Sequence, residues 1–422
     1  MYRGALGRWV ITVVLCGIAG TGCTDSDGGG EVDSGTETSA GDGDGDGDGD
    51  GDGDGDGDGD GDGGGDGDGD GDGDAPGLPP PAYDQWIKIE LPGTLCGNGS
   101  QYKFFANWHE GAKNVAVFFE PGGACWDYEG CTGGGLGVAN LNGIPDDHMD
   151  IWGFTYPMLN RSTNSAISDW NLIFIPYCTG DVHTGNNVIT YEDPAGVEED
   201  VVFEHAGHAN TMAAIDWMNL YFPSIDDLFV SGCSAGGAGT QINYYFLREG
   251  TNAARGFAVN DSGPIFPNSV HSAPLHAKIR SSWDVDPVID EIPEGEDVKA
   301  DFGNINTIIA DRWPEDRLGI TYFIRDYNYS RYSYENFYDG LTQDDIHQLW
   351  FEDTELLVEQ YDQRENLSYF LPYYRFLNDS HCSTIFAFLG SEIGDQNAGD
   401  YINDLLDPSK PMTSLVDWDG TL

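Results

Sequence analysis

The chain has 422 residues, 60 of them glycine, and a formal net charge of −55. Residues 41–74 hold 16 Asp and 18 Gly; without this tract and the net −3 of residues 1–40, the remaining 348 residues still carry −36. This charge excludes a protein that binds nucleic acid through phosphate contacts and disfavours docking on anionic lipid, whereas the remaining length suffices for a large core in one or two domains.

The N-terminus has the pattern of an export signal. Arg3 and Arg8 precede an apolar run, residues 9–19, that is too short to span a bilayer. The run leads to Gly20-Thr21-Gly22-Cys23, which resembles a bacterial lipoprotein signal, with Gly20 in place of the usual apolar residue. We expect residues 1–23 to be a signal peptide and Cys23 to be lipidated, giving a cell-surface lipoprotein. Cleavage without lipidation, giving a secreted protein, is the alternative.

Residues 24–80 contain almost no apolar side chains and are predicted to be a disordered, Asp/Gly-rich tether. Specific calcium binding by the Asp array is disfavoured, because its period is two whereas calcium-binding β-helix repeats have a period of nine. The tether ends in a proline run, and we place the folded domain at residues 81–422, with regular structure starting near Tyr83.

The cysteine count agrees with export. Six cysteines fall in the folded domain, an even number that predicts three disulfides in an exported protein. Cys125 and Cys131 are paired on proximity. The other four allow three connectivities, of which we favour Cys178–Cys233 because both follow strands beside the proposed site. The rival, metal binding, lacks a CxxC or HExxH motif, so no metal is expected. The six are Cys96, Cys125, Cys131, Cys178, Cys233 and Cys382.

The domain reads as α/β, with buried parallel strands alternating with helices. Helical patterns cover residues 208–222 and 237–248, and the acidic segments 265–318 and 340–368 are typical of insertions or lids. We predict an α/β-hydrolase-like, mostly parallel sheet with helices on both faces and lid insertions. The apolar runs predicted as strands are Val115–Phe119, Leu172–Pro176, Leu228–Ser231, Gly256–Val259 and Gly319–Ile324.

The chemistry is concentrated in one motif. Gly232-Cys233-Ser234-Ala235-Gly236 fits G-x-S-x-G between a predicted strand and a predicted helix, the context that a nucleophile elbow requires. Ser234 is the predicted nucleophile. The backbone N–H of Ala235 is one predicted oxyanion-hole donor, and that of Gly123 or Ala124, in the glycine loop after an earlier strand, is the other.

The base and the acid should follow the nucleophile in the chain. His381 is the last histidine, and Cys382 next to it could hold its loop by a disulfide. Asp326, after a late strand, is the favoured acid, and Asp261 is the alternative; if Asp326 is the acid, Asp261 shapes the pocket or ties down the loop. Trp126, Asp181 and His183 are predicted to lie at the pocket. No cofactor is needed.

Several segments resemble the pectin acetylesterase / Notum carboxylesterase family, in the same order over roughly residues 85–390. They are Leu95–Gly99, the Gly-Gly loop with Cys125-x5-Cys131, Pro176–Val182, Gly232–Gly237, Asp261–Gly263 and Ser380–Cys382. The resemblance implies Ser234 as nucleophile, Asp326 as acid, His381 as base, and Gly123, Ala124 and Ala235 in the oxyanion loops. It also implies removal of acyl groups, acetyl from pectin or a fatty acyl group from a protein.

Departures from the family pattern fall around the pocket, at Pro121, Ala124 and His183. A domain at −36 should also repel polygalacturonate, itself a polyanion, unless salt is high. We therefore expect a monomeric exported serine carboxylesterase that removes acyl groups, with acetyl favoured, from a glycan or other ester. Its partners would be the ester substrate and a membrane reached only through the lipid anchor. The alternatives are a lipid or protein deacylase and a catalytically inactive surface binding module.

Overall fold

The computed structural model describes residues 77–163, 165–267 and 271–422, and the following concerns these ranges. The predicted signal peptide with Cys23, and the predicted tether as far as residue 76, lie outside the described residues. Among the helices of the described ranges, none is long and apolar enough to cross a membrane.

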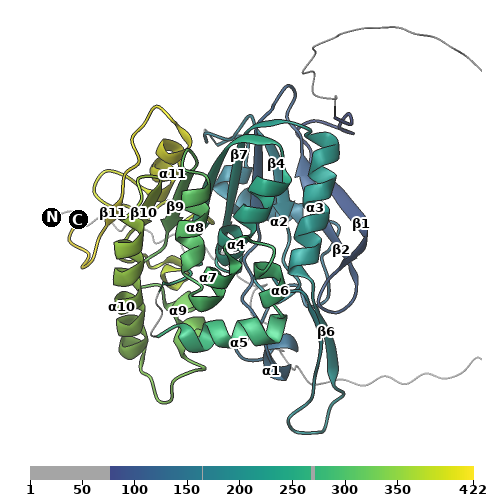
Figure 1. Cartoon of the computed structure of the whole chain (residues 1–422), viewed down its shortest axis with the longest axis vertical. Coiled ribbons are helices and arrows are strands. Elements are labelled where there is room, and N and C mark those ends of the chain that lie inside the picture. The colour runs from purple at the N-terminus through teal and green to yellow at the C-terminus, as the bar shows by residue number, and fades with distance from the viewer. Residues whose placement is uncertain (1–76, 164, 268–270) are drawn as a thin grey trace, which may run out of the picture. The chain divides into compact units, whose positions relative to one another are not determined.

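A nine-stranded sheet forms the framework (Figure 1). Its order is β1-β2-β4-β3-β7-β8-β9-β10-β11. The β1–β2 and β2–β4 pairs are antiparallel, and every pair of neighbours from β4 to β11 is parallel. These strands are β1 (Ile87–Leu95), β2 (Gln101–Asn107), β3 (Val115–Phe119), β4 (Asn171–Ile175), β7 (Ile225–Cys233), β8 (Ala253–Asp261), β9 (Arg317–Thr321), β10 (Leu367–Leu371) and β11 (Leu415–Val416). A separate antiparallel pair comprises β5 (Asn187–Tyr191) and β6 (Val201–His205).

Helices cover both faces of the sheet. Gly256 of β8 faces Tyr244 of the helix after the nucleophile motif, whereas Gly319 of β9 faces Tyr401 near the C-terminus. Val259, three residues after Gly256, pairs with Gly319, so the two glycines point to opposite faces. The α-helices are α1 (Tyr128–Cys131), α2 (Met149–Thr155), α3 (Gly207–Tyr221), α4 (Ala235–Gly250), α5 (Ala273–Trp283), α6 (Asp286–Ile289), α7 (Gly295–Ala300), α8 (Asn304–Arg312), α9 (Tyr327–Tyr334), α10 (Gln343–Tyr361) and α11 (Ala398–Leu406).

The predicted fold class is confirmed, and the five predicted strands are present as β3, β4, β7, β8 and β9. The runs that form β3 and β4 are completely buried, as the continuous apolar pattern of central parallel strands requires. The two predicted helices are α3 and α4. The predicted insertion 265–318 folds into α5 to α8, and 340–368 consists mainly of α10.

Two parts of the sheet were missing from the prediction. The first is the antiparallel edge, where β1 alternates between exposed and half-buried residues and therefore shows no continuous apolar run. The second is the opposite edge, β10 and β11: the start of β10 lies inside the segment predicted as an insertion, and β11 is only two residues long. β10 pairs with β9 on the side away from β8, and β11 pairs with β10 to complete this edge of the sheet.

The topology of the sheet brings the carboxyl ends of several strands to one edge. β3, β7, β9 and β10 are parallel, so their carboxyl ends lie on the same edge of the sheet. The glycine loop follows β3, Ser234 follows β7, Asp326 comes five residues after β9, and His381 comes ten residues after β10. Four segments that are distant in sequence therefore converge on one site.

Candidate active site

The turn at Ser234 is a strained strand-to-helix elbow. Its backbone has φ 58° and ψ −121°, a region that residues with a side chain rarely adopt. The turn is held on both sides, because Ser234 N–H donates to the Asp261 carbonyl at 2.8 Å and the Ala238 N–H donates to the Ser234 carbonyl at 3.0 Å. The structure therefore retains a conformation that presents the hydroxyl at the end of β7.

The glycines of the motif allow the start of α4 to pack closely against the ends of neighbouring strands. A Cβ on Gly232 would lie 2.5 Å from the Gly236 carbonyl oxygen, and one on Gly236 would clash with the Phe119 carbonyl at the end of β3. A Cβ on Gly237 would clash with the Asp261 backbone at the end of β8. The start of α4 is thus wedged between two strand ends, which only glycine permits.

Asp326 and His381 are in direct contact. His381 Nδ1 lies 2.8 Å from Asp326 Oδ2, and both side chains are buried. The other carboxylate oxygen caps α9, accepting from the N–H groups of Asn328 and Tyr329 at 3.0 Å each. One oxygen therefore fixes the carboxylate on a helix end and the other orients the imidazole, so the favoured acid is the one that contacts the predicted base.

Asp261, the alternative acid, contacts the loop beyond His381. Its carboxylate accepts from the N–H groups of Ser383 and Thr384, at 3.0 and 2.7 Å, and from the hydroxyls of Thr384 and Ser262. Burial raises the pKa of Asp261, and these hydrogen bonds oppose the rise. Its position matches the second role considered for it, that of tying down the loop.

Arg375 holds the same loop from its other side. Its guanidinium donates to the carbonyls of Ala387 and Cys382, and it lies 5.2 Å from the Phe323 ring centroid. The loop needs this support because Ser380 and Cys382 have positive φ, at 59° and 61°. Arg375 gave no signal in the sequence, since an isolated arginine in a loop is more often exposed.

The disulfide pattern corrects one prediction. Cys125–Cys131 is present, as expected from proximity, but Cys178 does not pair with Cys233. Cys178 pairs with Cys96 and Cys233 with Cys382, with Cα–Cα distances of 5.1 and 5.7 Å. The reason is topological: the chain after β10 returns to the end of β7, so residue 382 lies closer to Cys233 than the end of β4 does.

The Cys233–Cys382 disulfide links the neighbour of Ser234 to the neighbour of His381. A ring nitrogen of His381 lies within 4.8 Å of the Cys233 and Cys382 sulfurs. Among the described residues, no hydrogen bond joins the Ser234 hydroxyl to His381. Catalytic hydrogen bonds are often long before substrate binds, and the covalent link keeps the two residues in adjacent segments.

The glycine loop after β3 lies beside Ser234. Gly123, Ala124 and Ala235 line the same cavity as Ser234, so the three predicted oxyanion-hole residues are brought together. Gly123 has φ 73° and bridges to Val138. Tyr332 of α9 supports this region by donating its hydroxyl to the carbonyls of Leu136 and Gly137, at 2.6 and 2.8 Å. This role of Tyr332 was not predicted.

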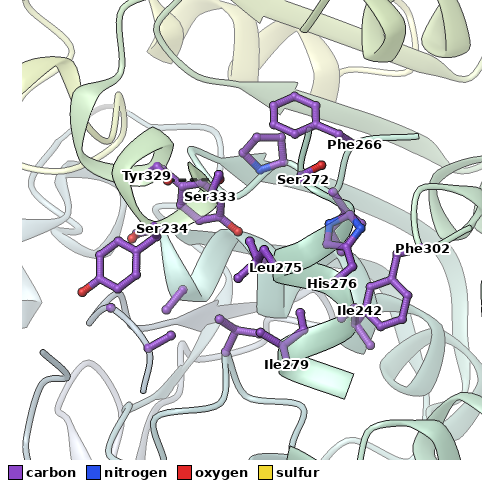
Figure 2. Close-up of a pocket in the computed structure, with 18 of the residues that line it drawn as sticks. Ser234, Ile242, Phe266, Ser272, Leu275, His276, Ile279, Phe302, Tyr329 and Ser333 are labelled. Carbon is purple, nitrogen blue, oxygen red and sulfur yellow. Dashed lines mark hydrogen bonds between the residues drawn. The ribbon is translucent and has the colours of Figure 1, made fainter. Parts of the chain in front are cut away.

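An apolar cavity extends from Ser234 (Figure 2). Figure 2 places Ser234 on one side, Leu275 near the middle, and His276 and Phe302 on the opposite side. Much of the wall comes from α4 and from the predicted insertion, chiefly α5. Its large apolar side chains include Trp126, Ile242, Ile265, Phe266, Leu275, Ile279, Trp283 and Phe302.

Trp126 lines this cavity, but Asp181 and His183 do not, which corrects their prediction as pocket residues. The Asp181 carboxylate accepts from the N–H groups of Gly207 and His183, and burial raises its pKa to about 7. His183 Nε2 contacts the Glu120 carbonyl at 2.9 Å, and burial lowers the pKa of its ring to about 4. Both side chains therefore hold the backbone of this segment in place behind the cavity. Of residues 181–183, only Val182 lines the cavity itself.

Comparison with known proteins finds similarity to one family of esterases. Residues 87–283 match the family model for pectinacetylesterase, a segment that contains Ser234 and ends before Asp326 and His381. The predicted resemblance to the pectin acetylesterase and Notum family is confirmed. The matching curated proteins are named as a pectin acetylesterase, from a plant, and a palmitoleoyl-protein carboxylesterase, from an animal.

Three similar proteins describe the range of the family. Pectin acetylesterase 7 of Arabidopsis thaliana is 28% identical over 147 residues, covering 34% of this chain and 35% of that protein. Palmitoleoyl-protein carboxylesterase notum2 of Xenopus laevis is 25% identical over 179 residues, covering 39% and 33%. The structure of the Wnt deacylase Notum from Drosophila covers 75% of this chain and 92% of its own, with 15% identity and a TM-score of 0.46. The chain spans about a third of the length of the two curated relatives.

The disulfides give a stability test. Cys233 and Cys382 are 149 residues apart and Cys125 and Cys131 only 6. Chain entropy then predicts a loss of about 5 kcal/mol of unfolding free energy for the Cys233→Ala/Cys382→Ala double variant and about 2 kcal/mol for Cys125→Ala/Cys131→Ala. Urea denaturation of both variants measures the difference. Equal losses would show that loop entropy does not govern the contribution of these disulfides.

Proposed function

We propose that this protein is an exported serine carboxylesterase in which Ser234, His381 and Asp326 form the catalytic triad. The observation that carries the proposal is the strained Ser234 elbow, covalently linked through Cys233–Cys382 to the loop of a histidine that is paired with a buried aspartate. Export is supported by the three disulfides, since such bonds persist in oxidising compartments.

The proposed reaction has two steps. Ser234 Oγ attacks the ester carbonyl carbon while His381 accepts the serine proton, and the alcohol leaves after His381 returns that proton to it. Water then attacks the acyl-enzyme, again with His381 as base, and releases the carboxylic acid. Asp326 orients the imidazole and stabilises its protonated form. The oxyanion of each tetrahedral intermediate would be bound by the N–H groups of Ala235 and of Gly123 or Ala124.

The cavity favours an apolar acyl group longer than acetyl. It begins at Ser234 and the proposed oxyanion donors, and most side chains beyond them are hydrocarbon or aromatic. An acetyl group would leave this apolar surface uncovered, whereas a longer chain gains free energy for each methylene that it buries there. A lipid or fatty-acyl ester is therefore favoured over the acetylated glycan expected from the sequence. The domain charge of −36 also favours an uncharged substrate.

Active-site labelling tests the enzyme class. The full-length protein should react covalently with a fluorophosphonate probe, and Ser234→Ala should not, because the probe phosphonylates an activated serine hydroxyl. Gel fluorescence and intact mass measure the adduct. Ser330→Ala is a matched control, because it removes a buried serine hydroxyl of α9 that makes no hydrogen bond among the described residues, and it leaves Ser234 unchanged. A folded wild-type protein that stays unlabelled would instead favour the inactive binding module.

Two aspartate variants test which aspartate orients His381 and which one holds the loop after it. Asp326→Asn keeps an oxygen to cap α9 but removes the charge facing His381, so kcat should fall by about 10⁴-fold with little change in Tm. Asp261→Asn leaves the N–H donors of Ser383 and Thr384 imperfectly paired, which should lower the free energy of unfolding by about 2 kcal/mol. Ester hydrolysis and thermal denaturation distinguish them. The acid assignment is wrong if Asp261→Asn abolishes turnover without destabilisation while Asp326→Asn remains active.

Acyl preference is measured with p-nitrophenyl esters from acetate to palmitate. We expect kcat/KM to rise from acetate to octanoate, since each added methylene enters the apolar cavity. Acetylated pectin should be a poor substrate at low ionic strength and a better one as salt screens the repulsion. A maximum at acetate, together with efficient release of acetate from pectin at low salt, would restore the acetylesterase interpretation.

A further inference from the structure

The far end of the cavity is a thin wall of two rings. His276 and Phe302 line the cavity that begins at Ser234, and both also line a second, surface depression next to Arg280 and Lys299. Their rings are stacked, with centroids 5.2 Å apart and an angle of 27° between planes. The two spaces are therefore separated by this pair of side chains, which come from α5 and from the segment between α7 and α8.

The wall is braced from its outer side. The Arg280 guanidinium lies 5.7 Å from the Phe302 ring centroid, and it is fixed by Asp286 at 2.6 and 2.8 Å and by the Lys299 carbonyl at 2.7 Å. Burial and the Arg280 charge lower the pKa of His276 to about 4, so its ring is uncharged at neutral pH. The inner face of the wall is thus an uncharged, positioned surface.

The distance from Ser234 to the far end of the cavity can be estimated along two helices, α4 and α5, and the two estimates agree. On α4, lining residues run from Ala235, next to the nucleophile, to Ile242, roughly 10 Å at the rise of an α-helix. On α5, Trp283 donates to the Cys125 carbonyl beside the glycine loop, and His276 lies seven residues earlier, again roughly 10 Å away. The wall therefore stands at the end of a slot that begins at Ser234, as Figure 2 also shows.

We propose that the stacked His276–Phe302 pair is the end wall that sets the longest acyl chain this site accepts, and that its removal joins the cavity to the surface depression. This inference rests on the proposed esterase function for its effect on turnover. A chain that reaches the wall fills the slot, and each further methylene must either displace a ring or remain outside. Chain length is thus limited by two side chains of the insertion, not by the triad.

The test compares hydrolysis of octanoyl and palmitoyl p-nitrophenyl esters by wild type, Phe302→Ala and His276→Ala. Truncating either ring should raise the palmitate-to-octanoate ratio of kcat/KM by about tenfold or more, because the longer chain gains a path into the depression. Lys299→Ala is the matched control: its side chain borders only the depression, so the ratio should stay at the wild-type value. Unchanged ratios in both ring variants, with octanoate turnover intact, would overturn the inference.

A binding experiment separates this inference from the esterase proposal. Octanoate and palmitate are titrated into Ser234→Ala, alone and combined with Phe302→Ala or with the milder Phe302→Leu. Binding is followed by isothermal titration calorimetry. Relative affinity for palmitate should rise about tenfold with Phe302→Ala and less with Phe302→Leu. If the palmitate-to-octanoate affinity ratio is unchanged, the end-wall inference is rejected even if the enzyme is active. If the ratio shifts in a protein without esterase activity, only the esterase proposal is rejected.

Discussion

The buried Asp261 is the point to which both halves of the candidate site are attached. Its backbone carbonyl accepts the N–H of Ser234, and its carboxylate accepts the N–H groups of Ser383 and Thr384 just beyond His381. A carboxylate that is 0% exposed is costly unless hydrogen-bonded, so the loop must adopt the one path that supplies these donors. The positions of nucleophile and histidine thus depend on one buried group at the end of β8.

Strain and its support occur in the same place. Ser234, Ser380 and Cys382 all have positive φ, and such conformations persist only where the surroundings fix them. Glycines at the start of α4 allow the close approach of strand ends, and the Cys233–Cys382 disulfide ties the two strained segments together. The carboxyl edge of the sheet therefore presents Ser234 and His381, while the helical insertion supplies much of the cavity wall.

Local patterns predicted the parts of the site that depend on local chemistry. The elbow was readable because strand, small residues and helix are consecutive, and Gly123 and Ala124 because a glycine loop directly follows a buried strand. Asp181 and His183 were misplaced, since a polar pair in a loop near the motif does not reveal which way its side chains point. Arg375 and Tyr332 were missed because their partners are carbonyls, which leave no mark on the sequence.

The sequence by itself determined the class of the domain, the location of the elbow at Ser234 and the order of the residues proposed to act with it, because these follow from apolar runs and small-residue spacing along the chain. Only the tertiary structure decided which aspartate meets His381, that Cys233 pairs with Cys382, and that His276 stacks on Phe302 in the cavity wall. In each case the two contacting residues are more than 20 positions apart in the sequence. The crossover connections of the parallel sheet bring them together, so such contacts depend on how the whole sheet packs.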